Sequence, residues 1–132
     1  MALQKWILGK ALSDSAILDR FESKYGMTIP SDLKACILSN NGAYPVPDGI
    51  QLANGAKDNV KALLSYEQDD PENIYEVMPF FEKEYGKKLL PFATNESSDY
   101  YCIQEGRVVL WTQSGDIFDV GENFTCFLNA LN

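Results

Sequence analysis

The most constraining feature of this sequence is the segment 99–112, which predicts a β-hairpin with apolar side chains on both faces. Glu105-Gly106 is a two-residue turn signal between two strand-forming runs. In the register that this turn sets, Tyr100 lies opposite Trp111 on one face, and further apolar pairs occupy the other. Because neither face is polar, one face must meet the core. The other face either lies under a helix or is an exposed apolar patch that binds a partner.

An N-terminal helix pair is predicted before this hairpin, at residues 13–25 and 30–41. Apolar residues recur in both segments at the three- and four-residue spacing of an amphipathic helix. Ser13 or Ser15 is placed to cap the first helix. Asn40-Asn41-Gly42 can supply the left-handed residue that ends the second helix.

A middle helix and a C-terminal helix are also predicted. Asp70 is placed to cap the middle helix, with Pro71 at its first position. Pro79 must kink or break this helix, and Gly86 ends it. The C-terminal helix follows Glu122, because apolar residues recur there with helical spacing.

Short apolar runs predict four further strands. These runs are residues 50–53, 60–66, 89–93 and 117–120. A turn at Asn54-Gly55 separates the first two runs. The prolines and the glycine between residues 45 and 49 mark a loop. Since the chain has no repeat, low-complexity tract or linker, we expect one domain over residues 1–132.

Negative charge is concentrated after residue 40. The chain carries a net charge of −8, and residues 1–40 hold five bases and four acids, so the remainder carries −9. One run of acids in it contains no base: Glu67, Asp69, Asp70, Glu72 and Glu76. Phosphate contacts need clustered Lys and Arg, so we expect no direct nucleic-acid ligand. The acidic run either attracts a basic protein partner or serves solubility alone.

The residue types that several kinds of catalysis require are missing or dispersed. The chain has no histidine, which excludes Ser-His and Cys-His nucleophile pairs and histidine-bearing zinc sites. We expect no metal and no cofactor. Paired carboxylates, Asp116 with Asp119 or Asp99 with Glu96, leave a carboxylate-dependent hydrolase as a remote alternative.

The cysteines and the apolar runs indicate a cytoplasmic protein. Cys36, Cys102 and Cys126 are far apart and form no CxxC pair, which favours reduced cysteines in the core. No apolar run approaches the ~18 residues that a membrane span requires. The run Trp6-Ile7-Leu8 is too short for the core of a signal peptide. We therefore expect no association with a membrane.

Several short blocks occur in a characteristic order along the chain. They are Ile29-Pro30, Asn40-Asn41-Gly42, Leu90-Pro91-Phe92-Ala93, Asp99-Tyr100-Tyr101-Cys102-Ile103, Gly106-Arg107-Val108 and Asn123-Phe124-Thr125-Cys126-Phe127-Leu128. Their order and spacing resemble the SUKH superfamily, in particular the branch typified by fungal cell-wall assembly regulators and many bacterial immunity proteins. The resemblance runs from about Ser13 to the C-terminus.

This resemblance implies an α+β fold, in which a curved, mostly antiparallel central sheet is packed against helices. It also implies a non-catalytic protein that binds and neutralises a cognate polymorphic toxin, very often a nuclease. The alternative is an intracellular scaffold or regulator of the cell-wall assembly type. For a toxin partner, we expect carboxylates to steer the encounter and aromatic residues to anchor it. The residues predicted for these two roles are Glu67, Asp69, Asp70 and Glu72, and Tyr100 and Trp111.

Overall fold

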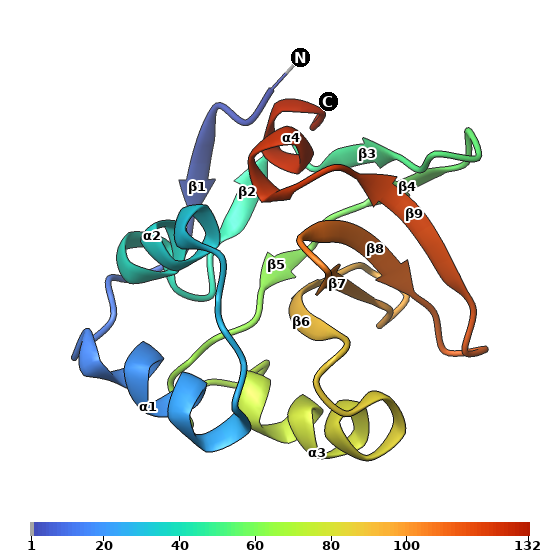
Figure 1. The fold of residues 1–132 in the computed structure, drawn as a ribbon. Coiled ribbons are helices and arrows are strands. Elements are labelled where there is room, and N and C mark those ends of the chain that lie inside the picture. Colours follow the sequence, from blue (N-terminus) through green and yellow to red (C-terminus); the bar gives the residue numbers. More distant parts are fainter. Residues whose placement is uncertain (1) are drawn as a thin grey trace.

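A five-stranded antiparallel sheet forms the centre of the computed structural model, which describes residues 2–132 (Figure 1). Its strands are neighbours in the order in which they follow along the chain. They are β5 (Ala62–Leu63), β6 (Leu90–Thr94), β7 (Tyr100–Gln104), β8 (Arg107–Trp111) and β9 (Ile117–Gly121). Bulges in the pairing of β6 with β7 and of β8 with β9 increase the local twist of the sheet.

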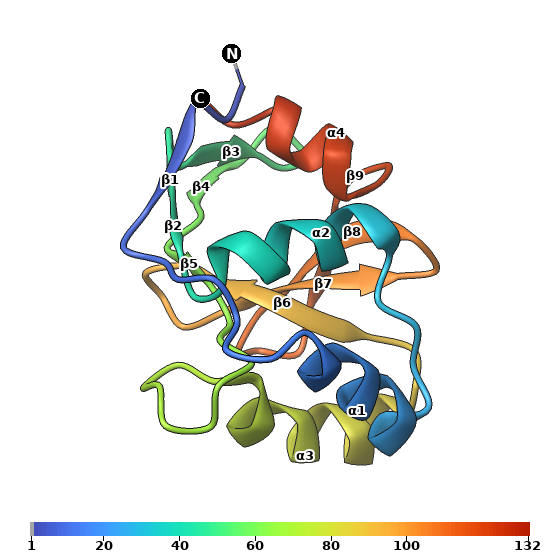
Figure 2. The same ribbon diagram turned by 90° about the vertical axis from the view of Figure 1, so that its left-hand side faces the viewer.

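Four helices surround this sheet. They are α1 (Ala16–Tyr25), α2 (Ser31–Asn40), α3 (Ile74–Tyr85) and α4 (Phe124–Asn129). Figure 2 shows α2 lying across the sheet, with α1 and α3 side by side at one end. Helix α4 packs against α2 and contacts β8 and β9. The predicted α+β class, with its helix pair, middle helix and C-terminal helix, is confirmed. Within residues 2–132, none of the helices has the length and apolar character needed to cross a membrane.

The β7–β8 hairpin has the register that the Glu105-Gly106 turn predicts, with Tyr100 opposite Trp111. Tyr101 points into the main core, to which α1, α2 and α4 contribute. Cys102 lies on the opposite face, in a second buried cluster with apolar residues of α3. Both faces are thus buried, and of the two alternatives for the second face, cover by a helix is correct.

Two pairs of short antiparallel strands lie outside the central sheet. β1 (Lys5–Ile7) pairs with β2 (Tyr44–Val46), and β3 (Gly49–Gln51) pairs with β4 (Lys57–Asn59). The predicted loop at 45–49 is therefore wrong at both ends, because Pro45 and Val46 lie in β2 and Gly49 lies in β3. The strand predicted at 60–66 is reduced to the two residues of β5. Strands of three residues are too short to show an alternating pattern in the sequence, and the partner of β1 lies far along the chain.

Helix α3 begins later than the sequence predicts. Its N-cap is Asn73, whose side-chain oxygen accepts a hydrogen bond from the backbone N–H of Glu76 at 3.1 Å. The prediction that Asp70 caps this helix is wrong, because its carboxylate instead accepts the hydroxyl of Ser65 at 2.6 Å. Pro79 lies inside α3 without breaking it, since the buried side chains on either side of it, Met78 and Phe81, hold the helix against the sheet.

The first and last helices also differ from the prediction at their ends. Neither Ser13 nor Ser15 caps α1 with its side chain, because the carboxylate of Asp14 accepts the backbone N–H of Ala16 at 2.9 Å. Helix α4 begins after Asn123, whose side-chain oxygen accepts the backbone N–H of Cys126 at 2.8 Å.

All three cysteines are free thiols, but they are not all in the core. Cys102 is buried, and burial raises the pKa of its thiol. Cys36 is half-buried, and loss of solvent raises the pKa of its thiol to about 11. Cys126 is exposed on α4. The prediction of three core cysteines is therefore wrong for Cys126, which lies on the outer side of a helix whose inner side is apolar.

Replacing Phe81 with alanine should lower the free energy of unfolding by about 3–5 kcal/mol, because Phe81 is 0% exposed and its loss leaves a cavity. The adjacent Phe80 is 44% exposed, and we expect Phe80→Ala to cost about 1 kcal/mol or less. Urea unfolding followed by circular dichroism measures both. Equal losses for the two variants would contradict the packing described for α3.

Acid should destabilise the junction of α1 and α2 through Glu22. The Glu22 carboxylate accepts hydrogen bonds from the ammonium of Lys34 at 2.8 Å and from the backbone N–H of Ile29 at 2.7 Å. The hydrogen bond from Lys34 lowers the pKa of Glu22 below 4.5. Because the pKa of this carboxyl group is lower in the folded state, its ionised form stabilises the folded protein at any pH above the unfolded-state pKa. This stabilisation is lost as the pH falls through the folded-state pKa. We expect Glu22→Gln to flatten the loss of stability below pH ~4.5 in urea titrations. The control Asp19→Asn removes the same charge from the exposed side of α1 and should retain that loss.

Candidate partner-binding site

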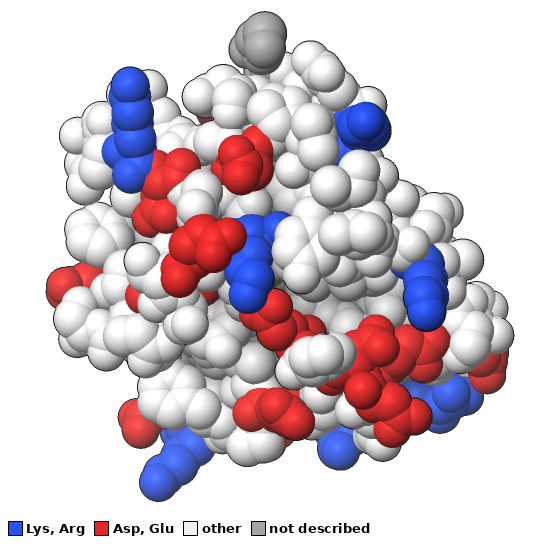
Figure 3. Space-filling model, turned by 180° about the vertical axis from the view of Figure 1, so that it is seen from behind, with Lys and Arg blue, Asp and Glu red and all other residues white. Residues whose placement is uncertain are grey.

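Acidic side chains gather on the segment that links the central sheet to α3. We call residues 67–72 the acidic loop. Figure 3 shows acidic side chains concentrated on the face that carries this loop. Asp69 and Asp70 are exposed, whereas Glu67 and Glu72 are half-buried. The structure therefore brings the four predicted carboxylates together.

The acidic loop forms one wall of a cleft of about 520 Å³. The N-terminal segment contributes Leu8, Lys10 and Ser13 to its lining. Leu8 is strongly exposed and has a backbone φ of 61°, a conformation that is uncommon for a residue other than glycine. We call this feature the acidic cleft. Its lining combines carboxylates with apolar side chains, among them the exposed Leu8.

A buried polar network holds the acidic loop in place. The side-chain amide of Asn41 donates to the hydroxyl of Ser65 at 2.9 Å, and its oxygen accepts the backbone N–H of Tyr66 at 2.8 Å. The Ser65 hydroxyl donates to Asp70 and accepts the backbone N–H of Glu67 at 3.0 Å. Asn41 was interpreted from the sequence only as part of a helix terminator, so its role in the loop was missed. No local signal marked this role, because the partners of Asn41 lie more than twenty residues further along the chain.

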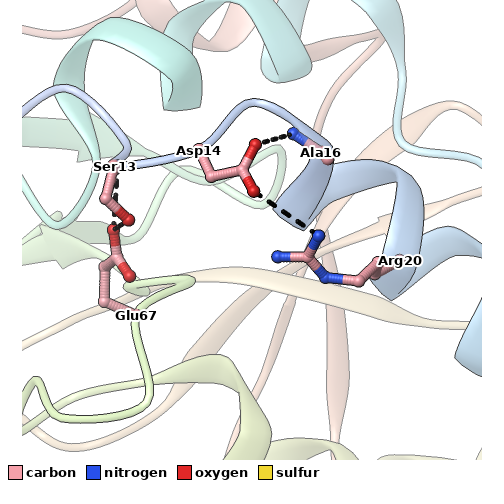
Figure 4. A network of polar contacts seen from close by, with 5 residues as sticks. All are labelled: Ser13, Asp14, Ala16, Arg20 and Glu67. Carbon is pink, nitrogen blue, oxygen red and sulfur yellow. Dashed lines mark hydrogen bonds and ion pairs between the residues drawn. The ribbon is translucent and has the colours of Figure 1, made fainter.

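The N-terminal segment is tied to the loop from the other side. Both the backbone N–H and the hydroxyl of Ser13 donate to one carboxylate oxygen of Glu67, at 3.0 and 2.8 Å (Figure 4). The next residue, Asp14, accepts the backbone N–H of Ala16 at the start of α1 and forms an exposed ion pair with Arg20 at 3.5 Å. Glu67 therefore closes the cleft, in addition to contributing charge.

Two lysines offset part of the negative charge. The Lys61 ammonium lies 3.0 Å from a carboxylate oxygen of Glu72, and this hydrogen bond raises the pKa of Lys61. Lys10 lines the cleft and is exposed. Asp69 differs from the other three acids, because within residues 2–132 its carboxylate accepts no hydrogen bond. Its full charge is therefore directed at solvent or at a partner.

The aromatic residues of the predicted site belong to a cluster beneath and beside α3. We define this aromatic cluster as Phe80, Phe81, Tyr85, Tyr100 and Trp111. Trp111 is only 6% exposed, and its indole N–H donates to the Tyr85 hydroxyl at 2.9 Å. Tyr100 is half-buried. Trp111 is therefore largely covered by its neighbours, whereas Tyr100 keeps part of its ring accessible.

Phe80 is the exposed aromatic that the sequence reasoning missed. Its ring centroid lies 5.2 Å from that of Trp111. The helical line through Ile74, Met78 and Phe81 is buried, which leaves Phe80 on the outer side of α3. The adjacent phenylalanines were the available signal, because consecutive helical residues cannot share one face.

Three of the four carboxylates considered for hydrolysis have structural partners, and the fourth, Glu96, is exposed. Asp119 forms a two-pronged contact with Arg107, with the shorter distance at 2.9 Å. Asp116 accepts the hydroxyl of Ser114, and Asp99 accepts the backbone N–H of Gln113. Each of these contacts orders a turn or a pair of strands. Across residues 2–132, no group of three or more Cys, Asp or Glu side chains is arranged to hold a metal ion.

Comparison with known proteins gives a family and a fold. The model of the SMI1/KNR4 family (SUKH-1) matches residues 12–130. A crystal structure of a protein from Pseudomonas syringae pv. tomato is similar with a TM-score of 0.53 and 19% sequence identity, covering 84% of this chain and 76% of that one. Among curated proteins, no sequence matches this chain. The family is consistent with an immunity-protein role and with protein–protein interaction.

Replacing Asn41 with alanine should release the acidic loop. The backbone N–H of Tyr66 loses its acceptor, and Ser65 loses the donor that orients it toward Asp70. We expect faster hydrogen exchange at Tyr66 and Glu67 and a loss of about 1–3 kcal/mol in the free energy of unfolding. The control is Asn40→Ala, because the Asn40 side chain donates to the Cys36 carbonyl of its own helix, away from the acidic loop. Unchanged exchange at Tyr66 in the Asn41 variant would show that other contacts order the loop.

Proposed function

The chain belongs to the SMI1/KNR4 family (SUKH-1), and on this premise we propose that it is an immunity protein that binds and neutralises a cognate bacterial polymorphic toxin. The observation that carries the proposal is the acidic cleft, in which four carboxylates lie together on an ordered loop. In this role the protein acts as a binding surface and needs no catalytic group, metal or cofactor. It meets its toxin in the cytoplasm.

The charge of the acidic cleft favours a nuclease as the toxin. Nucleases hold phosphates with clustered Lys and Arg, so their active sites attract anions. Asp69 and Asp70 present exposed carboxylates at the cleft. Their negative charges can take the place of the phosphate charges of a nuclease substrate. We propose that these residues dock over the basic site and occlude it.

The order of the loop favours tight binding. Asn41 and Ser65 fix the backbone of the acidic loop before any partner arrives. A loop that is already ordered loses little conformational entropy on association. The same carboxylates on a mobile loop would attract the toxin but would hold it less firmly. The loop is therefore suited to slow dissociation as well as to fast association.

Protection in cells is the first test of this function. Each of a panel of nuclease toxin domains is expressed in bacteria with and without this chain, and survival is measured. We expect the cognate toxin to be neutralised, and the purified pair to form a complex without nuclease activity. If no toxin domain is neutralised, the alternative of a scaffold or regulator is favoured.

With the cognate toxin identified, Asp69→Lys should slow association by about three- to tenfold at low salt and weaken its dependence on ionic strength. Asp69 is the best position, because its carboxylate takes no part in the hydrogen bonds that order the loop. The control Glu84→Lys makes the same change of charge at an exposed position of α3 that does not line the cleft. Stopped-flow measurements of the association rate distinguish the two variants. Equal rates for both would contradict a role of the acidic cleft in docking.

A further inference from the structure

A second hollow lies beside the acidic cleft, between the first turns of α3 and strands β6 and β7. Its volume is about 290 Å³, just below the ~300–1,000 Å³ range of small-molecule pockets. Its lining includes Glu72, Glu76, Phe80, Thr94 and Tyr100. We call it the α3 pocket. We infer that it receives one arginine side chain of the protein partner, with the guanidinium between the aromatic rings and the carboxylates.

The aromatic walls of the α3 pocket are exposed but fixed in position. Phe80 is the largest exposed apolar side chain on α3, and its inner side rests on the buried ring of Trp111. Tyr100 packs edge-on against Phe81, with ring centroids 5.7 Å apart. A planar guanidinium stacks favourably on such rings, and their rigidity reduces the entropic cost of binding.

The charge at the pocket selects a cation. Glu72 and Glu76 line the pocket together with Tyr100. Burial raises the pKa of the Tyr100 hydroxyl, and the negative charges of these two carboxylates raise it further. Glu72 is already paired with Lys61. The carboxylate of Glu76 accepts no hydrogen bond from residues 2–132 and is exposed, so it is available to a guest.

The start of α3 also lies at this pocket, and it does not convert the pocket into an anion site. A helix N-terminus carries a positive partial charge. Here the side chain of Asn73 accepts the backbone N–H of Glu76, and the Glu76 carboxylate adds a negative charge in the first turn. An anion in the pocket would face Glu72 and Glu76 directly, whereas a guanidinium would be attracted by both.

The α3 pocket is continuous with the acidic cleft. Pro71 and Glu72 line both features, so a partner that covers the cleft also reaches the pocket. The inference depends on the proposed function only in taking the partner to be a protein. In this arrangement, the acidic cleft attracts the basic partner over a distance, and the α3 pocket binds one of its arginine side chains. Buried aromatic–arginine contacts often contribute most of the binding energy at the centre of an interface.

A titration without any toxin tests this pocket. N-acetyl-arginine amide is added to the 15N-labelled full chain, and N-acetyl-citrulline amide serves as the uncharged analogue of nearly the same shape. We expect saturable shifts of the Val77 and Tyr100 amide signals with arginine, and affinity for citrulline lower by about fivefold or more. Equal affinities, or an absence of saturable shifts, would overturn the inference.

Matched variants locate the binding. Phe80→Ala and Glu76→Gln should each weaken arginine binding by about threefold or more, through loss of the aromatic wall or of the free carboxylate. Glu84→Gln removes an equal charge from the same helix outside the pocket and should leave the affinity unchanged. If Glu84→Gln weakens binding as much as Glu76→Gln, the arginine responds only to net charge and the pocket is not its site. Because the titrations use no toxin, they can be interpreted even if no toxin is neutralised. The inference about the pocket and the proposed function can therefore be contradicted independently.

Discussion

Burial of both faces of the β7–β8 hairpin is the constraint on which the other elements depend. A strand pair without a polar face needs two covers, and α2 with α4 supplies one while α3 supplies the other. The chain must therefore leave the edge strand β5 and reach the second face of the sheet. The acidic loop is the connection that does so. The placement of the proposed binding surface thus follows from how the sheet is covered.

A connection of this kind leaves backbone groups without partners in the sheet or in a helix. Asn41 provides hydrogen-bond partners for these groups. Its side-chain oxygen accepts the backbone N–H of Tyr66, and its amide donates to the hydroxyl of Ser65. That hydroxyl in turn accepts the backbone N–H of Glu67. Buried networks in which every member is satisfied specify one arrangement strongly. The end of α2 and the acidic loop are therefore ordered together, although more than twenty residues separate them in the chain.

The elements that sequence reasoning predicted well are those set by local chemistry. Glu105-Gly106 fixes the hairpin register, and the helical spacing of apolar residues fixes the existence of all four helices. Strand β1 was missed because its pairing with β2 joins segments about forty residues apart. The Asn73 cap of α3 is local, but it was missed because Asp70-Pro71 offered a competing helix start. For the site, the acidic run was visible as charge. Its support by Asn41 required the tertiary fold, because the partners of Asn41 are distant in the chain. The exposure of Phe80 was open to prediction, because Phe80 and Phe81 cannot both lie on the buried face of α3.

The residues proposed to contact a partner are different from those that stabilise the fold. Asp69 makes no hydrogen bond within the described chain, and Phe80 covers a buried tryptophan without completing the core. Substitutions at such positions change the free energy of unfolding little. The residues that support them, among them Asn41 and Phe81, are buried, and substitutions there are expected to destabilise the fold. A fold arranged in this way can acquire new partners through a few exposed side chains while the loop and α3 keep their geometry.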